Sequence, residues 1–249
     1  MFFFLLQKIF NVTIDITLKD CYIFNVMSIV TTKRKRCTYN KNSIKRGKIM
    51  NAQKCLEILR EIKDVSFATV DEKGLPQIRI IDVMIVEDEK LYFCTARGKD
   101  FYRQLLRDDH VAVSAMNTKW QMVRLSGTAD KLEDQKHWID RIFTENPSMN
   151  SVYPDDSRYV LEAFCIQNGE VEFFDLGQEP IVRESFGIGK EGAKEAGFYI
   201  TNDCIQCGVC EKVCPQKCIK KYKIDQTHCI HCGLCQEKCP AGAVKRKGE

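Results

Sequence analysis

The sequence lacks any run of about eighteen apolar residues, the length that a helix needs to cross a bilayer. Its apolar start, Met1–Leu6, has no basic segment before it and is interrupted by Gln7 and Lys8, unlike a secretory signal peptide. Residues 50–249 also lack a large excess of charge of one sign, because they contain 28 Lys and Arg and 32 Asp and Glu. We therefore expect no membrane span and no binding to membranes or nucleic acid.

Residues 1–49 differ in composition from the rest of the chain. They carry ten Lys and Arg but only two acidic residues, and they are rich in the residues that AT-rich codons encode. Arg46-Gly47 can be encoded by AGG-GGN, a purine run that resembles a ribosome-binding site shortly before the Met50 codon. We expect translation to begin at Met50 and residues 1–49 to be an upstream extension of the reading frame. The alternative is a disordered basic leader.

Cysteine is abundant, with fourteen residues, and eight of them form two copies of the pattern C-x2-C-x2-C-x3-C-P. In this pattern three cysteines bind one four-iron cluster and the fourth binds the neighbouring cluster. We expect Gly208 and Gly233 to bend the backbone close to inorganic sulfide, where a residue without Cβ avoids strain. The predicted ligands are Cys204, Cys207, Cys210 and Cys239 for one [4Fe-4S] cluster, and Cys229, Cys232, Cys235 and Cys214 for the other.

Two other kinds of site also use closely spaced cysteines. A four-cysteine zinc site needs only two C-x2-C pairs, whereas each copy here adds a third Cys and a Cys-Pro. A disulfide framework is typical of short secreted chains, and this chain has 249 residues. Cys218, four residues after Cys214, is interpreted as a spare buried thiol rather than a ligand. Because clusters of this kind need reduced thiols, we expect a cytoplasmic protein. About residues 199–244 resemble the bacterial two-cluster ferredoxins.

The chain before these motifs shows mainly strand patterns. Asn51 is a good N-cap for an amphipathic helix that reaches about Lys63. Asn168-Gly169 is typical of a two-residue hairpin turn. Further helices are expected at 98–107 and 133–145. Strands are expected at 66–70, 77–86, 91–95, 111–116, 121–130, 159–166 and 170–174. Six or seven strands with few helical crossovers predict a closed antiparallel barrel.

Several of these segments resemble the pyridoxamine-phosphate-oxidase-like, FMN-binding split barrels, over about residues 52–176. The resemblance is carried by Phe67–Arg79, Leu91–Thr95, Gly98-Lys99 and Val123–Gly127. It implies a homodimer with FMN bound in a cleft between the subunits, although some barrels of this kind bind haem or a deazaflavin. It also implies that residues 79–84 run along the flavin and that Lys99 holds its phosphate. The implied contacts are Arg79, Ile80, Ile81, Asp82, Cys94, Thr95 and Lys99, with Gln121 or Met122 beside the isoalloxazine.

The residue types themselves favour an anion site in this barrel. The guanidinium of Arg79 suits a bidentate phosphate contact, and Thr95 ends a strand with a hydroxyl. Lys99 opens a helix, where free N–H groups attract phosphate. The alternative is that Arg79 and Lys99 are ordinary surface charges. Residues 178–189 stand where true pyridoxamine phosphate oxidases have an Arg-containing substrate segment, so vitamin B6 synthesis is not expected.

The sequence thus predicts a mainly β, α+β protein. A six-stranded antiparallel split β-barrel is expected at 50–178, a linker at 179–198, and a small ferredoxin-like two-[4Fe-4S] domain at 199–249. We expect an FMN-dependent oxidoreductase that takes electrons from a ferredoxin or similar donor and reduces a small-molecule acceptor. Related barrels include nitro-group reductases. The competing interpretation is a non-enzymatic electron carrier or redox sensor whose barrel serves dimerisation and docking. No side chain stands out as a catalytic acid or base.

Overall fold

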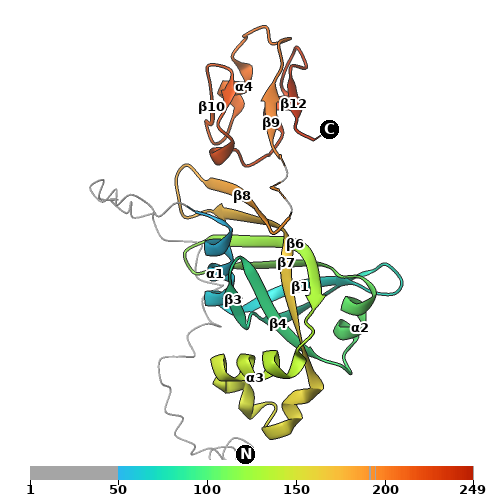
Figure 1. Cartoon of the computed structure of the whole chain (residues 1–249). Coiled ribbons are helices and arrows are strands. Elements are labelled where there is room, and N and C mark those ends of the chain that lie inside the picture. The colour runs from blue at the N-terminus through green and yellow to red at the C-terminus, as the bar shows by residue number, and fades with distance from the viewer. Residues whose placement is uncertain (1–49, 191, 194, 249) are drawn as a thin grey trace, which may run out of the picture. The chain divides into compact units, whose positions relative to one another are not determined.

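The computed structural model describes residues 50–190, 192–193 and 195–248. Residues 1–49, for which we expected an upstream extension or a leader, lie outside the described residues. Figure 1 shows a curled sheet accompanied by helices α1, α2 and α3, and a small domain of short elements that begins at β9. No helix in the described part of the chain combines the length and the apolar character needed to cross a bilayer.

Helix α1 (Ala52–Ile62) begins where the sequence predicts it. The side chain of Asn51 accepts a hydrogen bond from the backbone N–H of Lys54 (3.0 Å), which caps the first turn. Cys55 and Leu59 lie one turn apart on the buried face and join the main core of the sheet. The other two expected helices are also present, α2 at Asp100–Arg107 and α3 at Gln135–Glu145. Two 3-10 turns follow α3, at Pro147–Ser151 and Asp155–Val160.

The large sheet has eight strands, all antiparallel, in the order β2-β1-β5-β6-β7-β4-β3, with β8 paired to β7. The expected mainly β fold is confirmed, with eight strands in place of the six expected. The strands are β1 Asp64–Val70, β2 Pro76–Asp82, β3 Ile85–Glu87, β4 Lys90–Ala96, β5 His110–Met116, β6 Gln121–Lys131, β7 Leu161–Asp175 and β8 Val182–Ile188.

The two strands at the ends of the sheet, β2 and β3, are consecutive in the chain, so the segment between them connects the two ends of the curled sheet. We expected one strand over 77–86, but the structure bends it at Val83 and Met84. The N–H of Val83 donates to the carbonyl of Lys63 beside β1, and the N–H of Met84 donates to the carbonyl of Tyr92 in β4, both at 2.9 Å. One run of chain therefore hydrogen-bonds first on the β1 side and then to β4, so it joins the two ends of the sheet.

Strand β7 corrects the expected hairpin at Asn168-Gly169. The chain does not turn there: one edge of β7 pairs with β6, while its other edge pairs first with β4 and then with β8. Gly169 has a φ of +152° and lies opposite Gly127. A Cβ on Gly127 or Gly169 would stand 2.2 or 2.3 Å from a backbone oxygen of the other strand. The glycines thus permit a close strand crossing next to a shift of register.

Strand β8 lies inside the range that we expected to be a linker, 179–198. It pairs along the second half of β7 and ends at Ile188, which is buried in the main core. Buried and exposed side chains do not alternate clearly along this short strand. This explains why the Gly-containing sequence was interpreted as a linker. The connection between β8 and β9 consists of residues 189–197 only.

Aromatic rings fix α2 against the sheet. Phe67 of β1 lies 4.7 Å from Phe93 of β4 and 5.2 Å from Phe101 of α2, between ring centres, and Phe93 lies 5.6 Å from Phe164 of β7. All four are buried, and each contributes roughly 1.5–3 kcal/mol through its burial. This packing sets the start of α2 beside β2 and β4, the strands that carry most of the predicted flavin contacts.

The small domain is built from two ladders and two short helices. Strand β9 (Phe198–Ile200) pairs with β12 (Val244–Arg246), and β10 (Ile219–Lys220) pairs with β11 (Lys223–Ile224). The helices are α4 (Val209–Val213) and α5 (Leu234–Glu237), with a 3-10 turn at Gln226–His228. Its core contains few ordinary apolar side chains. Instead, the buried residues are Phe198, Ile219 and Val244 together with Cys210, Cys218, Cys229 and Cys235.

Candidate redox sites

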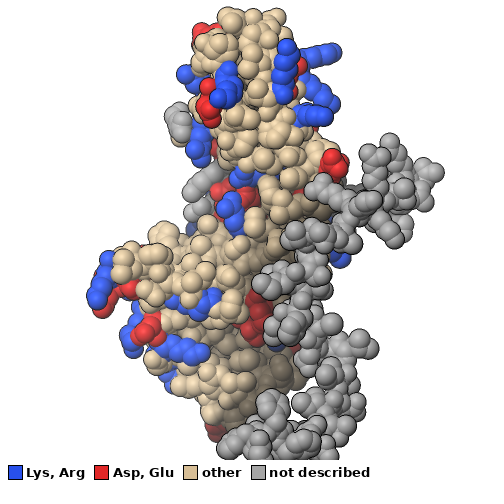
Figure 2. Space-filling model, turned by 180° about the vertical axis from the view of Figure 1, so that it is seen from behind, with Lys and Arg blue, Asp and Glu red and all other residues tan. Residues whose placement is uncertain are grey.

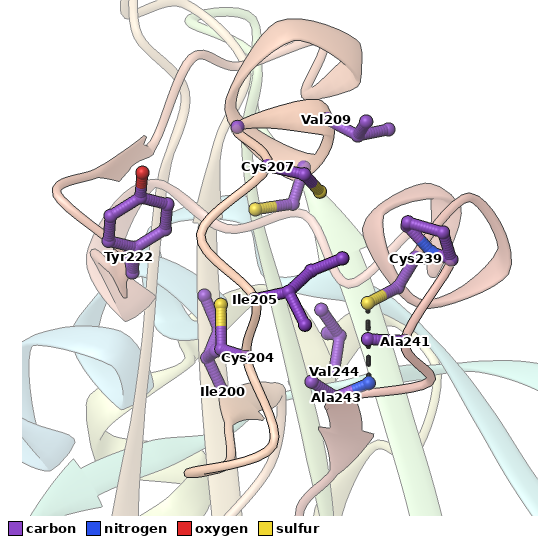
Figure 3. A pocket seen from close by; sticks show the side chains of 13 residues that line it. Ile200, Cys204, Ile205, Cys207, Val209, Tyr222, Cys239, Ala241, Ala243 and Val244 are labelled. Carbon is purple, nitrogen blue, oxygen red and sulfur yellow. Dashed lines mark hydrogen bonds between the residues drawn. The ribbon is translucent and has the colours of Figure 1, made fainter.

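Four cysteines from both copies of the motif line one cavity of the small domain. They are the four residues predicted to bind the first cluster, Cys204, Cys207, Cys210 and Cys239. Figure 3 shows Cys204, Cys207 and Cys239 around this cavity with apolar neighbours that include Ile205 and Val244. The structure therefore brings the predicted set together, although Cys239 belongs to the other copy. Ligation itself stays a prediction.

A second cavity contains the second predicted set. It is lined by Cys229, Cys232 and Cys235 from the second copy and by Cys214 from the first. A fifth thiol, Cys218, lines the same cavity. The fourth cysteine of each copy thus lies with the three cysteines of the other copy, which is the crossed arrangement that the motif predicts.

Two glycines shape the loops around these cavities. Gly208 (φ +72°) and Gly233 (φ +78°) have left-handed backbone conformations and immediately precede α4 and α5. The first turns of these helices carry Cys210 and Cys235. A residue with a Cβ is strained in this conformation, so the expectation of a sharp bend at each glycine is confirmed.

Burial and backbone hydrogen bonds shift the pKa values of the predicted ligand thiols in opposite directions. Burial raises the pKa of Cys235 to about 11, and such a thiol keeps its proton unless a metal replaces it. Burial acts in the same direction on Cys239, but backbone N–H groups of residues 241–244 outweigh it and lower the pKa of this thiol. One of these groups, the N–H of Ala243, lies 3.2 Å from the Cys239 sulfur. These N–H groups thus favour the thiolate of Cys239, the form that binds iron.

In the barrel, Arg79 of β2 lies half-buried against α2. Its guanidinium donates to Oγ1 of Thr69 (2.6 Å) and to Oε1 of Gln104 (2.9 Å). It also lies 3.3 Å from the carbonyl oxygen of Phe67 and 4.7 Å from the ring centre of Phe101. These partners are neutral, no carboxylate pairs with Arg79 among the described residues, and burial lowers its pKa. A half-buried cation with only neutral partners is a suitable group for binding phosphate.

Three further predicted contacts lie beside the start of α2. Thr95, near the end of β4, is buried, and within the described residues its Oγ1 has no hydrogen-bond partner. An unpaired buried hydroxyl costs about 1–3 kcal/mol, which a bound ligand would recover. Burial, followed by the charge of Asp82, raises the pKa of Cys94 to about 12, while Lys99 acts in the opposite direction. Lys99 directly precedes α2.

The other predicted contacts in β2 have mixed surroundings. Ile80 is 61% exposed, whereas Ile81 packs against the main core. Asp82 pairs with Lys63 at 3.4 Å and, by hydrogen bonding, raises the pKa of Asp64 on the neighbouring strand. Ile80 is therefore free for contact with a ligand or another subunit, while Ile81 and Asp82 already have protein partners.

Gln121 lies far along the sheet from Thr95, another predicted contact. It begins β6 opposite Asp175, the last residue of β7, and its side chain bonds to Asn117 and Asp175. Thr95 instead pairs with Glu162, near the first residue of β7. These two positions are separated by roughly 40 Å along the strand, at about 3.3 Å per residue. One copy of the chain does not bring Gln121 together with Thr95.

The comparisons with known proteins agree with the two kinds of site. Residues 52–157 match the family model described as pyridoxamine 5'-phosphate oxidase, and residues 198–220 and 222–245 each match the 4Fe-4S binding domain. The chain thus carries one segment similar to pyridoxamine 5'-phosphate oxidase and, after it, two segments similar to the 4Fe-4S binding domain. The second match occurs twice, once over each copy of the cysteine motif. No curated protein shows a significant match to the chain.

Several solved structures resemble about half of this chain. A nimc/nima family protein from Clostridium acetobutylicum is 23% identical, with a TM-score of 0.47 over 55% of this chain and 93% of that one. A protein related to general stress protein 26, from the same organism, is 18% identical, with a TM-score of 0.45 over 56% and 97%. A pyridoxamine 5'-phosphate oxidase-related, FMN-binding protein from Nostoc punctiforme PCC 73102 is 13% identical, with a TM-score of 0.38 over 55% and 93%.

Sequence reasoning missed three features of these sites. Thr69 and Gln104 hold Arg79, but a Thr in a strand and a Gln in a helix carry no distinctive pattern. The place of Cys218 in the second cavity was missed because a lone thiol four residues after a ligand has no fixed spacing rule. The ring of His228 lies 3.0 Å, through Nδ1, from the carbonyl oxygen of Ile181. That contact depends on how β8 meets the 4Fe-4S domain, which the sequence does not indicate.

Proposed function

We propose that this chain is an oxidoreductase in which two [4Fe-4S] clusters and FMN together carry electrons to a small acceptor. FMN exchanges one or two electrons and each cluster exchanges one, so the combination links single-electron donors to two-electron chemistry. The observation that carries the proposal is the presence of both sites in one chain. Two cavities hold four predicted ligands each, and the barrel holds an unpaired buried hydroxyl and a half-buried cation with neutral partners.

The barrel residues in this proposal bind and orient the cofactor. Arg79 and Lys99 hold the phosphate, and Thr95 supplies a hydrogen bond. Burial raises the pKa of both Tyr92 and Cys94 to about 12, so these groups keep their protons at neutral pH and do not act as bases. The proposal therefore gives the protein a role in binding and positioning, with no side-chain acid or base named.

We further propose a homodimer in a reducing compartment, the cytoplasm. The dimer is supported by the position of Gln121, because a site that uses both Gln121 and Thr95 needs one of them from a second copy. The compartment is supported by the cysteines, since the predicted clusters need reduced thiols and none of the twelve described cysteines forms a disulfide.

The electron donor in this proposal is an acidic electron-transfer protein such as a ferredoxin. Residues 198–249 carry nine Lys and Arg against five Asp and Glu, whereas residues 50–197 carry nineteen against twenty-seven. On the face seen in Figure 2, Lys and Arg side chains, with some Asp and Glu among them, lie along both edges of the 4Fe-4S domain, and uncharged surface lies between the edges. Surface lysines of this kind attract and orient an acidic partner.

The test follows electrons into the flavin. The full chain, loaded with clusters and FMN, is mixed anaerobically with a reduced ferredoxin while the flavin absorbance is recorded. We expect rapid flavin reduction that slows as salt is added. Cys204→Ser, which removes one predicted cluster ligand and leaves the barrel untouched, should keep its FMN but lose most of this rate. Equal rates in the two proteins would contradict the proposal.

A second function has one specific observation in its favour. The guanidinium of Arg79 is already held by Thr69 and Gln104, as it would be if its role were structural. In that case the chain is an electron carrier or redox sensor, and the barrel is a dimerisation and docking module. A carrier of this kind would contain iron but would bind no flavin, which the cofactor content decides.

A further inference from the structure

The two cluster sites are related by an internal repeat, and one of the positions at which the two copies differ places an extra thiol in a cavity. Four residues after the last cysteine of each copy stands Cys218 in the first copy and Ala243 in the second. Both residues are buried, and each lines one cavity: Ala243 the cavity of the first cysteine set, and Cys218 the cavity of the second. One cavity therefore contains a fifth thiol where the other contains a methyl group.

The Cys218 thiol lies against a predicted ligand. Its sulfur lies 3.5 Å from the sulfur of Cys214, and Cys229 lines the same cavity. The equivalent Ala243 offers only its backbone N–H, which donates to the Cys239 sulfur at 3.2 Å. The side chain of Cys218 thus adds an S–H donor that the other cavity does not have at the equivalent position.

The cavity with the fifth thiol is also the one beside the barrel. Gln216, which lines it, has Oε1 3.4 Å from the backbone N–H of Ile181. His228, next to the ligand Cys229, has Nδ1 3.0 Å from the carbonyl oxygen of the same Ile181. Ile181 directly precedes β8 of the barrel sheet. We call this cavity the inner site and the cavity of Cys204, Cys207, Cys210 and Cys239 the outer site.

The course of β9 agrees with this order. Phe198, the first residue of β9 after the connection from the barrel, lines the inner site. Ile200, two residues further on, lines the outer site together with Val244. The chain thus passes the inner site before it reaches the outer site.

We propose that Cys218 makes the two sites unequal by raising the reduction potential of the inner cluster above that of the outer cluster. A hydrogen bond to a ligand sulfur stabilises the added negative charge of the reduced cluster, so it raises the potential. With clusters bound, one electron would pass from the outer cluster to the inner one, which would oxidise the first by one electron and reduce the second by one, with no bond made or broken. Cys218 acts through the ligand sulfur atoms, and its effect is to favour the reduced state of the cluster beside the barrel. The inference rests on the cluster part of the proposed function and does not need FMN.

The experiment compares reduction potentials in the full chain by anaerobic titration, with the reduced clusters followed by electron paramagnetic resonance. Wild type should show two midpoints. In Cys218→Ala the higher midpoint should fall toward the lower one, and Cys218→Ser, which keeps a donor, should fall less. The matched variant Ala243→Cys should raise the lower midpoint instead.

Two results would overturn the inference. Unchanged midpoints in both Cys218→Ala and Ala243→Cys, at full iron content, would show that the fifth thiol does not influence the clusters. Loss of about four irons in Cys218→Ala would show that Cys218 is itself a ligand. Both readouts concern iron alone, so they are distinguishable from a failure of the proposed function, which would appear as missing flavin or as absent flavin reduction.

Discussion

Thr95 and Gln121 pair with opposite ends of the same strand, Thr95 with Glu162 and Gln121 with Asp175. Both residues belong to the predicted flavin contacts, yet a single chain holds them apart along the length of β7. A site that uses both must take them from two chains, and this relationship leads to a test of the dimer that does not depend on knowing the substrate.

A mixed dimer should regain flavin that each parent has lost. We expect Arg79→Ala and Gln121→Ala each to bind FMN weakly as homodimers. When the two variants are combined, one site of the mixed dimer carries both changes and the other carries neither, so about half of the wild-type FMN should return. Flavin content of doubly tagged, purified mixed dimers measures this. If the mixture binds no more FMN than its parents, the two residues act in the same copy or not on FMN at all.

Arg79→Ala alone should weaken FMN binding by about 10- to 150-fold. This range corresponds to the loss of a charge-assisted hydrogen bond worth roughly 1.5–3 kcal/mol. Arg103→Ala is the matched control, because Arg103 lies on the neighbouring helix α2 and is exposed next to Asp100. Dissociation constants from flavin fluorescence quenching decide between them, and thermal melting of the flavin-free proteins separates binding from the loss of the contacts to Thr69 and Gln104. Equal affinities for the two variants would remove Arg79 from the phosphate site.

Truncation of the Phe93 side chain should lower the free energy of unfolding of the barrel. Phe93 is fully buried and stacks between Phe67 and Phe164, so Phe93→Ala should cost about 3–5 kcal/mol of folding free energy. Phe93→Leu, which leaves a smaller cavity, should cost less. Urea unfolding followed by tryptophan fluorescence reports on this domain, because both tryptophans of the sequence, Trp120 and Trp138, precede β8. A cost below 1 kcal/mol for the alanine variant would contradict the described packing.

Stability of the barrel should fall above pH 9. Burial raises the pKa of Cys55, Cys94 and Cys165 from the usual 9.0 to about 12 each. The folded state therefore holds these protons more tightly than the unfolded state. The resulting contribution to the free energy of unfolding is complete below pH 9 and is lost as the pH rises from 9 towards 12. Each thiol contributes a slope of up to about 1.4 kcal/mol per pH unit in that window. Urea unfolding at pH 8 and pH 10 checks the change, and Cys55→Ala should reduce the slope.

Local chemistry made part of the fold and the sites predictable. Asn51 predicts the start of α1 because its side chain can accept a hydrogen bond from a free backbone N–H. The cysteine spacing predicts which thiols lie together because a four-iron cluster requires that spacing. Gly208 and Gly233 were expected at sharp bends and have left-handed backbones. In each case a short segment carries its own physical constraint.

The failures share a different cause, since they depend on partners distant in sequence. Asn168-Gly169 has the composition of a turn, but the pairing of β7 with β6 keeps the chain extended there. Residues 182–188 form a strand only because β7 offers a free edge. Cys218 shares a cavity with Cys229, Cys232 and Cys235 only because the two cysteine copies are folded together. Such arrangements are not visible in residue types or periodicity.

The most direct test of the account is the cofactor content of the chain expressed from Met50 under anaerobic conditions, read from its visible spectrum with iron and flavin assays. We predict about eight irons and one FMN per chain, because each cysteine set holds a four-iron cluster and each chain contributes one flavin site. About eight irons without flavin would contradict the oxidoreductase and leave an electron carrier on a dimerising barrel.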